Sequence, residues 1–288
     1  MAKLLVTGAT GQLGALVVEH LLTKVPADQV AVSVRDPQKA EALKARGVDV
    51  RFGDFNQPES LAAAFKGIDR LLIVSTSDVG NRVKQQIEAV KAAKQANVGF
   101  IAYTSAPRAD TSKFALVDDH RATEEAIRAT GIPYAFVRNN WYLENEIQTI
   151  QAVLHGAPWV TSAGDGKVGW ATRKDYAEAA ANVLAGEGRD NTVYELAGKP
   201  TTIAELAAIL AEVSGKDAQV QQVDDATYAS IMSGAGVPEP AIPFVVSIQQ
   251  AIRDGSLDVE SDDLPTLLGR PLTPLAVGLR EIVSGLQG

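Results

Sequence analysis

The sequence contains no cysteine and only three histidines among its 288 residues. Without cysteine, the chain can form no disulfide, thiolate zinc site or iron–sulfur cluster, and it has no cysteine nucleophile. The histidines, His20, His120 and His155, are widely spaced, so a histidine-rich metal site is not expected either. We therefore expect a protein without a metal cofactor.

Positive charge and long apolar runs are also scarce. Asp and Glu number 35 against 27 Lys and Arg, which gives a net charge of −8. Because a nucleic-acid partner requires a basic surface against its phosphates, we expect none. No apolar run reaches the length of a membrane span, and the first residues lack the basic and apolar regions of a secretory signal. These absences predict a soluble, cytoplasmic protein without a membrane partner.

What the sequence does contain is a glycine pattern close to its start. Gly8, Gly11 and Gly14 follow an apolar run that ends at Val6 and precede a segment of helical periodicity over 15–22. A strand, a glycine turn and a helix in this order form the context of a dinucleotide-binding site, although the spacing is GxxGxxG rather than GxGxxG. The N-terminus of the helix would offer free N–H groups and a positive dipole to phosphates.

The rest of the first half alternates between strand-like and helical segments. Apolar runs that indicate strands occur at 29–34, 48–52, 69–74, 99–103 and 133–138. This alternation predicts an α/β fold, a doubly wound parallel Rossmann sheet with a ligand crevice at the carboxyl ends of its strands, and a smaller C-terminal α/β lobe. We expect the sheet domain at 1–155, completed by about 171–198, and the lobe at 156–170 and 199–288.

The end of the second predicted strand carries Arg35 and Asp36. In dinucleotide-binding sheets an acidic residue here binds the ribose 2′-OH of NAD, whereas an arginine accommodates the 2′-phosphate of NADP. A guanidinium pairs with phosphate through two parallel hydrogen bonds. Arg35 directly follows the strand, which favours NADP(H). If Asp36 points into the crevice instead, NAD becomes the better interpretation.

Other strand ends supply further candidates. Asp54 could accept a hydrogen bond from the adenine amino group beside Phe55, or Asp54 could only cap its own turn. Ser75 and Ser77 follow a central strand, where small hydroxyl residues often approach the cofactor or cap the next helix. Farther along, Thr172 and Asp175 fit a T-x-x-D capping box.

The catalytic residues are harder to assign. Short-chain dehydrogenases donate a proton from the tyrosine of a Tyr-x-x-x-Lys pair, and no tyrosine of this sequence has a lysine four residues later. The remaining polar or aromatic residues at the expected edge of the sheet are Thr104, Ser105, His120, Asn140 and Tyr142. An imidazole at His120 could protonate a reduced substrate, or it could simply begin a helix. No G-x-S-x-G elbow supports a hydrolase.

Taken together, several of these segments resemble the NmrA-like branch of the atypical short-chain dehydrogenases/reductases. The resemblance lies in Thr7–Gly14, Arg35, Gly53–Phe55, Phe100–Ser105, Arg138–Tyr142 and Gly164–Lys167. Within that branch the chain is most similar to the bacterial NADPH-dependent quinone oxidoreductases of type 2, and triphenylmethane dye reductases are close relatives. The resemblance covers nearly the whole chain and is weakest over 230–288.

The resemblance implies NADPH, hydride transfer to a quinone or similar flat aromatic acceptor, and no flavin. Carried over by position, the phosphates would be held by Gly8, Thr10, Gly11, Gln12 and Leu13, and the 2′-phosphate by Arg35. Asp54 and Phe55 would flank the adenine, while Ser75, Ser77, Thr104 and Ser105 would lie along the ribose and nicotinamide. Asn140 and Tyr142 would face the substrate.

A quinone gains aromaticity on reduction and needs little acid assistance, so water or His120 could supply the proton and positioning would contribute most of the catalysis. The alternative is an NADP-sensing regulatory protein without turnover, because the family's namesake resembles an enzyme but works by binding a partner. A nucleoside-sugar epimerase would require the missing Tyr-x-x-x-Lys pair. A homodimer through an exposed apolar helix face is compatible with the sequence.

Overall fold

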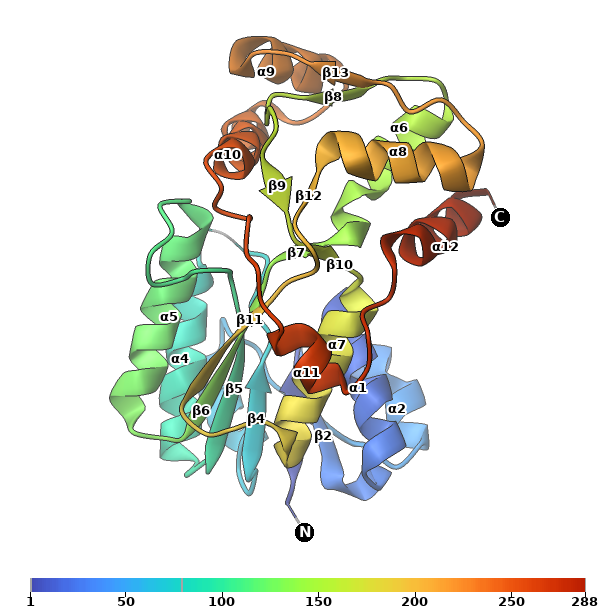
Figure 1. Ribbon diagram of the computed structural model, residues 1–288. Coiled ribbons are helices and arrows are strands. Elements are labelled where there is room, and N and C mark those ends of the chain that lie inside the picture. The colour runs from blue at the N-terminus through green and yellow to red at the C-terminus, as the bar shows by residue number, and fades with distance from the viewer. Residues whose placement is uncertain (1, 79, 288) are drawn as a thin grey trace.

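The computed structural model describes residues 2–78 and 80–287; Met1 and Gly288, which the expected domain limits include, lie outside it. Its centre is a seven-stranded sheet in the order β11-β6-β5-β4-β1-β2-β3 (Figure 1). All its strand pairs are parallel, which confirms the expected doubly wound fold. The strands are β1 (Leu4–Thr7), β2 (Val30–Val34), β3 (Asp49–Phe52), β4 (Arg70–Ile73), β5 (Phe100–Ser105), β6 (Tyr134–Asn139) and β11 (Thr192–Leu196).

Side chains alternate between two helical layers along each strand, as the two-residue period of a strand requires. In β1, Leu4 and Val6 pack into one apolar cluster and Leu5 into the other. The first layer consists of α1 (Gln12–Lys24), α7 (Arg173–Asn182) and α11 (Asp263–Leu268), and the second of α3 (Pro58–Ala64), α4 (Arg82–Gln95) and α5 (Leu116–Thr130). The short α2 (Glu41–Ala45) follows the 3₁₀ turn η2 (Pro37–Ala40).

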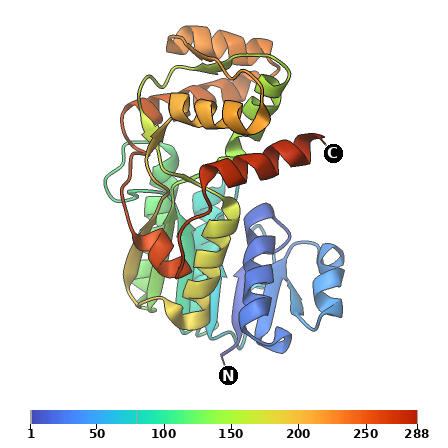
Figure 2. The same ribbon diagram turned by 45° about the vertical axis from the view of Figure 1, so that its right-hand side comes forward.

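A smaller lobe lies over the carboxyl edge of the sheet (Figures 1 and 2). Its helices are α6 (Ile147–Leu154), α8 (Ile203–Ser214), α9 (Asp225–Gly234), α10 (Ile242–Arg253) and α12 (Leu275–Gln287). Its short strands pair as β10 (Trp170–Ala171) with β7 (Trp141–Tyr142), β12 (Thr201–Thr202) with β9 (Lys167–Val168), and β13 (Val220–Gln222) with β8 (Trp159–Thr161). Single helical turns are η1 (Ala27–Gln29), η3 (Leu143–Glu146), η4 (Val183–Glu187) and η5 (Glu239–Ala241).

The packing bears on where the two lobes divide. Leu143, Ile150 and Val153 belong to the apolar core of the smaller lobe, although they lie within the expected 1–155 segment. Leu264, Leu267 and Leu268 of α11, within the expected 199–288 segment, pack against the sheet layer instead. The division into two lobes therefore stays a prediction, and these contacts favour a boundary closer to residue 142 than to 155.

The start of α7 differs in part from the expected capping box. Thr172 does cap the helix, because its Oγ1 accepts a hydrogen bond from the Asp175 N–H at 3.2 Å. The fully buried Asp175 carboxylate instead accepts bonds from the Arg270 guanidinium at 2.7 Å and from Thr273 at 2.9 Å. Asp175 therefore ties α7 to the segment that leads into α12.

Two negative findings concern only the part of the chain that the structure describes. No helix there is both long and apolar enough to cross a membrane. No group of three histidine, aspartate or glutamate side chains is arranged there to hold a metal ion.

Candidate functional site

A crevice of about 710 Å³ opens at the carboxyl ends of β1 to β4, where the smaller lobe meets the sheet. The cofactor residues expected from the sequence line it together, except for Thr104 and Ser105. Those that line it are Gly8, Thr10, Gly11, Gln12, Leu13, Arg35, Asp54, Phe55, Ser75 and Ser77. Of the expected catalytic residues, Tyr142 lines this crevice, whereas His120 and Asn140 do not.

The glycine turn is built for close backbone contacts. Gly8 has a φ of 62°, in the left-handed region that favours glycine. A Cβ on Gly14 would lie 2.3 Å from the Gly8 carbonyl oxygen, so only glycine lets α1 approach the turn this closely. No side chain caps α1 at Gly11. The first N–H groups of the helix, which have no acceptor within it, therefore face the crevice as an anion-binding site.

The residues after β2 separate the two cofactor hypotheses. Asp36 accepts a hydrogen bond from the Gln38 N–H at 3.1 Å and so caps the η2 turn. Arg35 lines the crevice, and Lys39 from η2 lies there too. Within residues 2–78 and 80–287 the exposed Arg35 guanidinium forms neither a hydrogen bond nor an ion pair. The end of the crevice next to β2 therefore presents the positive charges of Arg35 and Lys39. The Asp36 carboxylate, which would favour NAD, is engaged in the cap of η2.

Asp54 caps its own loop and also borders the crevice. Its Oδ1 accepts from the Asn56 N–H at 2.9 Å, and its Oδ2 from the Gln57 amide at 3.5 Å. Gly53 packs tightly, since a Cβ there would lie 2.1 Å from the Ser33 hydroxyl oxygen. Asp54 therefore caps its own turn. The neighbouring Phe55 lines the crevice.

Thr104 holds the backbone of the loop after β4 through a hydrogen bond. Its buried Oγ1 accepts a hydrogen bond from the Ser75 N–H at 2.8 Å. Thr7 likewise accepts from the Val74 N–H at 2.9 Å. These bonds fix the loop that carries Ser75 and Ser77 into the crevice, so Thr104 acts on the site through Ser75.

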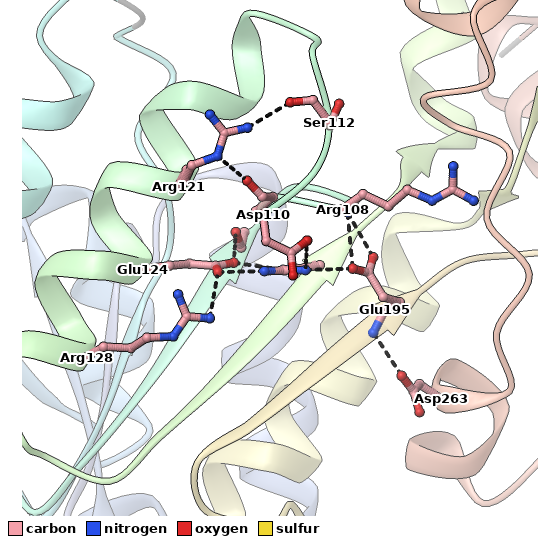
Figure 3. Close-up of polar contacts among 11 residues, drawn as sticks. Arg108, Asp110, Ser112, Arg121, Glu124, Arg128, Glu195 and Asp263 are labelled. Atoms are coloured by element: carbon pink, nitrogen blue, oxygen red, sulfur yellow. Dashed lines mark hydrogen bonds and ion pairs between the residues drawn. The ribbon is translucent and has the colours of Figure 1, made fainter.

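Ser105 belongs to a buried charged network on the other side of β5. Figure 3 shows this network around Glu124 and Glu195. The Ser105 hydroxyl donates to Glu124 of α5 at 2.6 Å. Arg138 donates to the same carboxylate at 2.9 and 2.8 Å, and to Glu195 of β11 at 2.9 Å. Burial by itself lowers the pKa of Arg138. The hydrogen bonds and negative charges of Glu124 and Glu195 together have a larger effect, so the pKa of Arg138 is raised above its ordinary value. The Ser105 hydroxyl is therefore committed to the protein interior rather than to the crevice.

His120 is buried between α5 and the sheet, with only 6% of its surface exposed. Its Nδ1 lies 2.8 Å from the hydroxyl oxygen of Tyr103. Burial lowers the pKa of His120 to about 3, and the nearby Arg82 guanidinium acts in the same direction. His120 is therefore uncharged near neutral pH and away from the crevice lining, so this placement does not support the expected proton transfer to a substrate.

The segment after β6 is divided between interior and crevice. The buried Asn140 donates through Nδ2 to the Leu257 carbonyl oxygen at 3.0 Å and so attaches the strand end to the smaller lobe. Tyr142 lines the crevice, and its hydroxyl oxygen accepts from Asn139 Nδ2 at 3.0 Å. Burial raises the Tyr142 pKa, against weaker opposite effects of Asn139 and Arg173. The phenol therefore keeps its proton near neutral pH.

Several crevice residues were not expected from the sequence. They are Lys39, Asn56, Arg82, Gln85, Asn145 and Arg173. Lys39 had a signal, because it is a cation only four residues after Arg35. No sequence signal identified Arg173, because the sequence pattern does not show that the start of α7 lies at the same crevice as the glycine turn.

Comparisons with known proteins agree with this architecture. Residues 1–259 match the model of the NmrA-like family. Quinone oxidoreductase 2 of Escherichia coli K12 is 42% identical over 94% of this chain and 95% of its own length. NAD(P)H azoreductase of Xenophilus azovorans is 29% identical over 95% of both chains.

Solved structures show the same similarity in three dimensions. The NADPH complex of the E. coli quinone oxidoreductase QOR2 superposes with a TM-score of 0.94, at 40% identity over 97% of this chain and 99% of that chain. The NADP(H) complex of Citrobacter sp. triphenylmethane reductase gives a TM-score of 0.92, at 44% identity with the same coverage.

Proposed function

The chain belongs to the NmrA-like family, and from this premise we propose that it is an NADPH-dependent oxidoreductase that reduces quinones or similar flat aromatic acceptors without flavin. Relatives that align over nearly its full length include a quinone oxidoreductase and a triphenylmethane reductase. The observation that carries the proposal is the crevice at the carboxyl edge of the sheet, with Arg35 at one end and Tyr142 at the other.

NADPH fits the residues at the β2 end of the crevice better than NADH does. Arg35 and Lys39 supply two cationic groups for the 2′-phosphate, and a guanidinium can bind phosphate through two hydrogen bonds. Asp36 is occupied at the N-terminus of η2. Asp54 and Phe55 follow β3 and line the same crevice, where they would border the adenine.

The diphosphate of the cofactor fits the glycine turn. Gly8, Thr10, Gly11, Gln12 and Leu13 line this part of the crevice. The uncapped start of α1 offers N–H groups and the positive end of the helix dipole. Ser75 and Ser77 lie along the ribose positions, and Thr104 holds their loop in place.

NADPH supplies a hydride when it is bound, and the protein positions the acceptor beside it. Tyr142 forms an aromatic wall at the β6 end of the crevice. Its hydroxyl accepts a hydrogen bond from Asn139, so its own O–H can donate a hydrogen bond to an acceptor oxygen. Asn140 fixes this segment through Leu257 rather than by touching the acceptor. Because a quinone becomes aromatic on reduction, positioning suffices and water supplies the proton.

Two further expectations belong to this proposal. The net charge of −8 supports a protein that does not bind nucleic acid. Phe244 of α10 and Val277 of α12 are exposed apolar side chains on which a homodimer could form. Light scattering after size-exclusion chromatography measures the oligomeric state directly.

The decisive experiment is NADPH oxidation in the presence of a panel of quinones and triphenylmethane dyes, with NADH as the comparison. Acceptor-dependent oxidation that is faster with NADPH supports the proposal. Tight NADP(H) binding without turnover on any acceptor contradicts it and favours the NADP-sensing regulator. Turnover with equal rates for both nucleotides contradicts the role of Arg35.

A further inference from the structure

Glu146 carries a carboxylate that the proposed function does not use. It ends the η3 turn, and its Oε1 accepts hydrogen bonds from the indole N–H groups of Trp141 at 3.0 Å and Trp170 at 3.2 Å. The side chain is partly buried. Burial raises the Glu146 pKa, although the two indole bonds act in the opposite direction. The smaller lobe therefore holds this acid by two neutral donors.

Strand pairing explains why two indoles meet at one carboxylate. Trp141 of β7 and Trp170 of β10 are register partners in a parallel pair. Side chains at matched positions of neighbouring strands lie on the same face, so both indoles can reach the same oxygen atom. The η3 turn follows β7 directly and brings Glu146 to the two indole N–H groups. The backbone thus sets the position of the carboxylate before any ligand binds.

Glu146 differs from the fully buried carboxylates in having no cation beside it. Glu124 is paired with Arg138, and Asp175 is paired with Arg270. Within residues 2–78 and 80–287 no lysine or arginine side chain forms an ion pair with Glu146, and no positive charge acts on its pKa. A carboxylate that is taken out of water without a paired cation is costly to the fold. An acid in such surroundings is a candidate for binding or catalysis.

The second oxygen of this carboxylate is open to a ligand. Across the described ranges 2–78 and 80–287, Glu146 Oε2 accepts no hydrogen bond, and it is not enclosed by protein atoms. The hydroxyl of Tyr228 on α9 is likewise neither bonded nor enclosed there. Burial raises the Tyr228 pKa, and the negative charge of Glu146 acts in the same direction. The carboxylate and the phenol therefore influence each other across a part of the lobe that a ligand can enter.

These surroundings suit an organic cation better than a metal ion. Calcium and magnesium take six or more oxygen ligands, and no three acidic or histidine side chains of the described chain are grouped to hold a metal. An organic ammonium ion needs one counter-charge, and aromatic rings attract it through their π electrons. Trp141 and Trp170 supply indole surface, and Leu143 and Ile150 belong to the same apolar cluster.

We infer that Glu146 and the two indoles bonded to it form a binding site for an organic ammonium ion in the smaller lobe. The ion neutralises the carboxylate through Oε2, while Oε1 stays with Trp141 and Trp170. None of these residues lines the cofactor crevice, so the site goes beyond the proposed function and does not require NADP(H). The ammonium group belongs either to a free amine or to an aromatic acceptor, because η3 also carries Asn145, which lines the crevice.

The test titrates the protein with tetramethylammonium chloride and follows tryptophan fluorescence, with sodium chloride as the ionic-strength control. Two of the three tryptophans bond Glu146, so binding should change the emission saturably, with a roughly millimolar dissociation constant. Saturation-transfer NMR on the methyl protons of tetramethylammonium detects binding independently of the emission. Neutral tert-butyl alcohol, of similar size, should give no saturable change.

Glu146→Gln removes the charge but keeps an oxygen for the indole bonds, and it should weaken tetramethylammonium binding at least roughly tenfold. The matched control is Glu212→Gln, which neutralises an exposed carboxylate of α8 and should bind like the unsubstituted chain. No binding to the unsubstituted chain in either measurement overturns the inference. Equal binding by the unsubstituted chain and Glu146→Gln also overturns it, because the ion then lies elsewhere.

A second arm identifies the source of the ammonium group. It measures KM in NADPH oxidation for a neutral quinone and for a cationic triphenylmethane dye. If the group belongs to the acceptor, Glu146→Gln should raise KM for the dye at least roughly tenfold and leave KM for the quinone within about twofold. If it belongs to a free amine, both KM values should stay the same while tetramethylammonium binding is lost. If no acceptor is turned over, the proposed function fails, whereas the binding measurements still decide this inference.

Discussion

The guanidinium of Arg138 and the carboxylate of Glu124 form a buried pair with two hydrogen bonds in parallel. Nε to Oε1 measures 2.9 Å and Nη2 to Oε2 measures 2.8 Å, and the two residues are 2% and 1% exposed. Around this pair the network extends to Glu195 and to the Arg108 backbone N–H (Figure 3). It therefore connects β5, β6 and β11 at the edge of the sheet that meets the smaller lobe.

Removing one member of this pair should destabilise the fold strongly. In Glu124→Ala, Arg138 stays buried and loses two of its hydrogen bonds, so we expect the free energy of unfolding to fall by about 3 kcal/mol or more. Urea denaturation measures the change. The exposed neighbour Glu125 provides the control, because Glu125→Ala should change stability by less than about 0.5 kcal/mol. Similar stabilities for the two variants would contradict the importance of the network.

Arg35→Asp should reverse the cofactor preference. It replaces the cation with a carboxylate that repels the 2′-phosphate and can accept from a ribose 2′-OH. We expect kcat/KM for NADPH to fall roughly 100-fold, while the value for NADH stays the same or rises. Asp36→Asn is the matched control, because Asp36 only caps η2 and its substitution should leave the preference unaltered. An undiminished preference for NADPH in Arg35→Asp would show that another residue binds the 2′-phosphate.

His120 should influence stability at low pH but not the pH dependence of turnover. Its folded pKa of about 3 lies below the ordinary value of 6.5, so the unfolded chain binds more protons between these two values. Stability from His120 is therefore complete above about pH 6.5 and is lost progressively as the pH falls toward 3. His120→Gln should flatten this part of the stability curve.

The catalytic part of the same prediction uses the pH profile of kcat/KM. His120→Gln should retain the profile of the unsubstituted enzyme, because the ring is buried against Tyr103 and does not line the crevice. His155→Gln serves as the control for both measurements, since His155 is exposed and its Nδ1 lies 2.7 Å from the carbonyl oxygen of Gln151. A titration step of kcat/KM that disappears only in His120→Gln would restore His120 as a proton donor.

Tyr142→Phe should separate the ring from the hydroxyl at the acceptor end of the crevice. The ring remains as an aromatic wall, so NADPH affinity should be nearly unchanged. Loss of one neutral hydrogen bond should lower kcat for a quinone about two- to tenfold. Tyr176→Phe is the comparison, because the Tyr176 hydroxyl bonds the Gly169 carbonyl in the interior and does not line the crevice. If both variants lose kcat equally, the effect comes from packing rather than from the hydroxyl.

Much of the fold followed from local patterns. Apolar runs at 29–34, 48–52, 69–74, 99–103 and 133–138 correspond to the strands β2, β3, β4, β5 and β6. His120, which the sequence allowed to begin a helix, lies within α5 instead, because that helix already begins at Leu116. The first turns of α5 have buried polar residues, which weaken the apolar periodicity there.

The placement of polar side chains at the strand ends was less predictable. Ser105 lies two residues after Tyr103, and alternate residues of a strand point to the same face. Tyr103 faces the layer of α4 and α5, so Ser105 meets Glu124 there and not the crevice. The sequence contained this alternation, but nothing in it showed which face would border the ligand.

By itself, the sequence determined the parallel sheet, the glycine turn and the cation after the second strand, because each depends on the periodicity or backbone freedom of a short segment. Only the tertiary structure decided the surroundings of the side chains. Packing buried His120 beside Tyr103, engaged Asp36 with a helical turn, and brought Arg173 to the glycine turn from far along the chain. Such contacts depend on how distant elements pack, and the pattern of one segment does not encode the position of another.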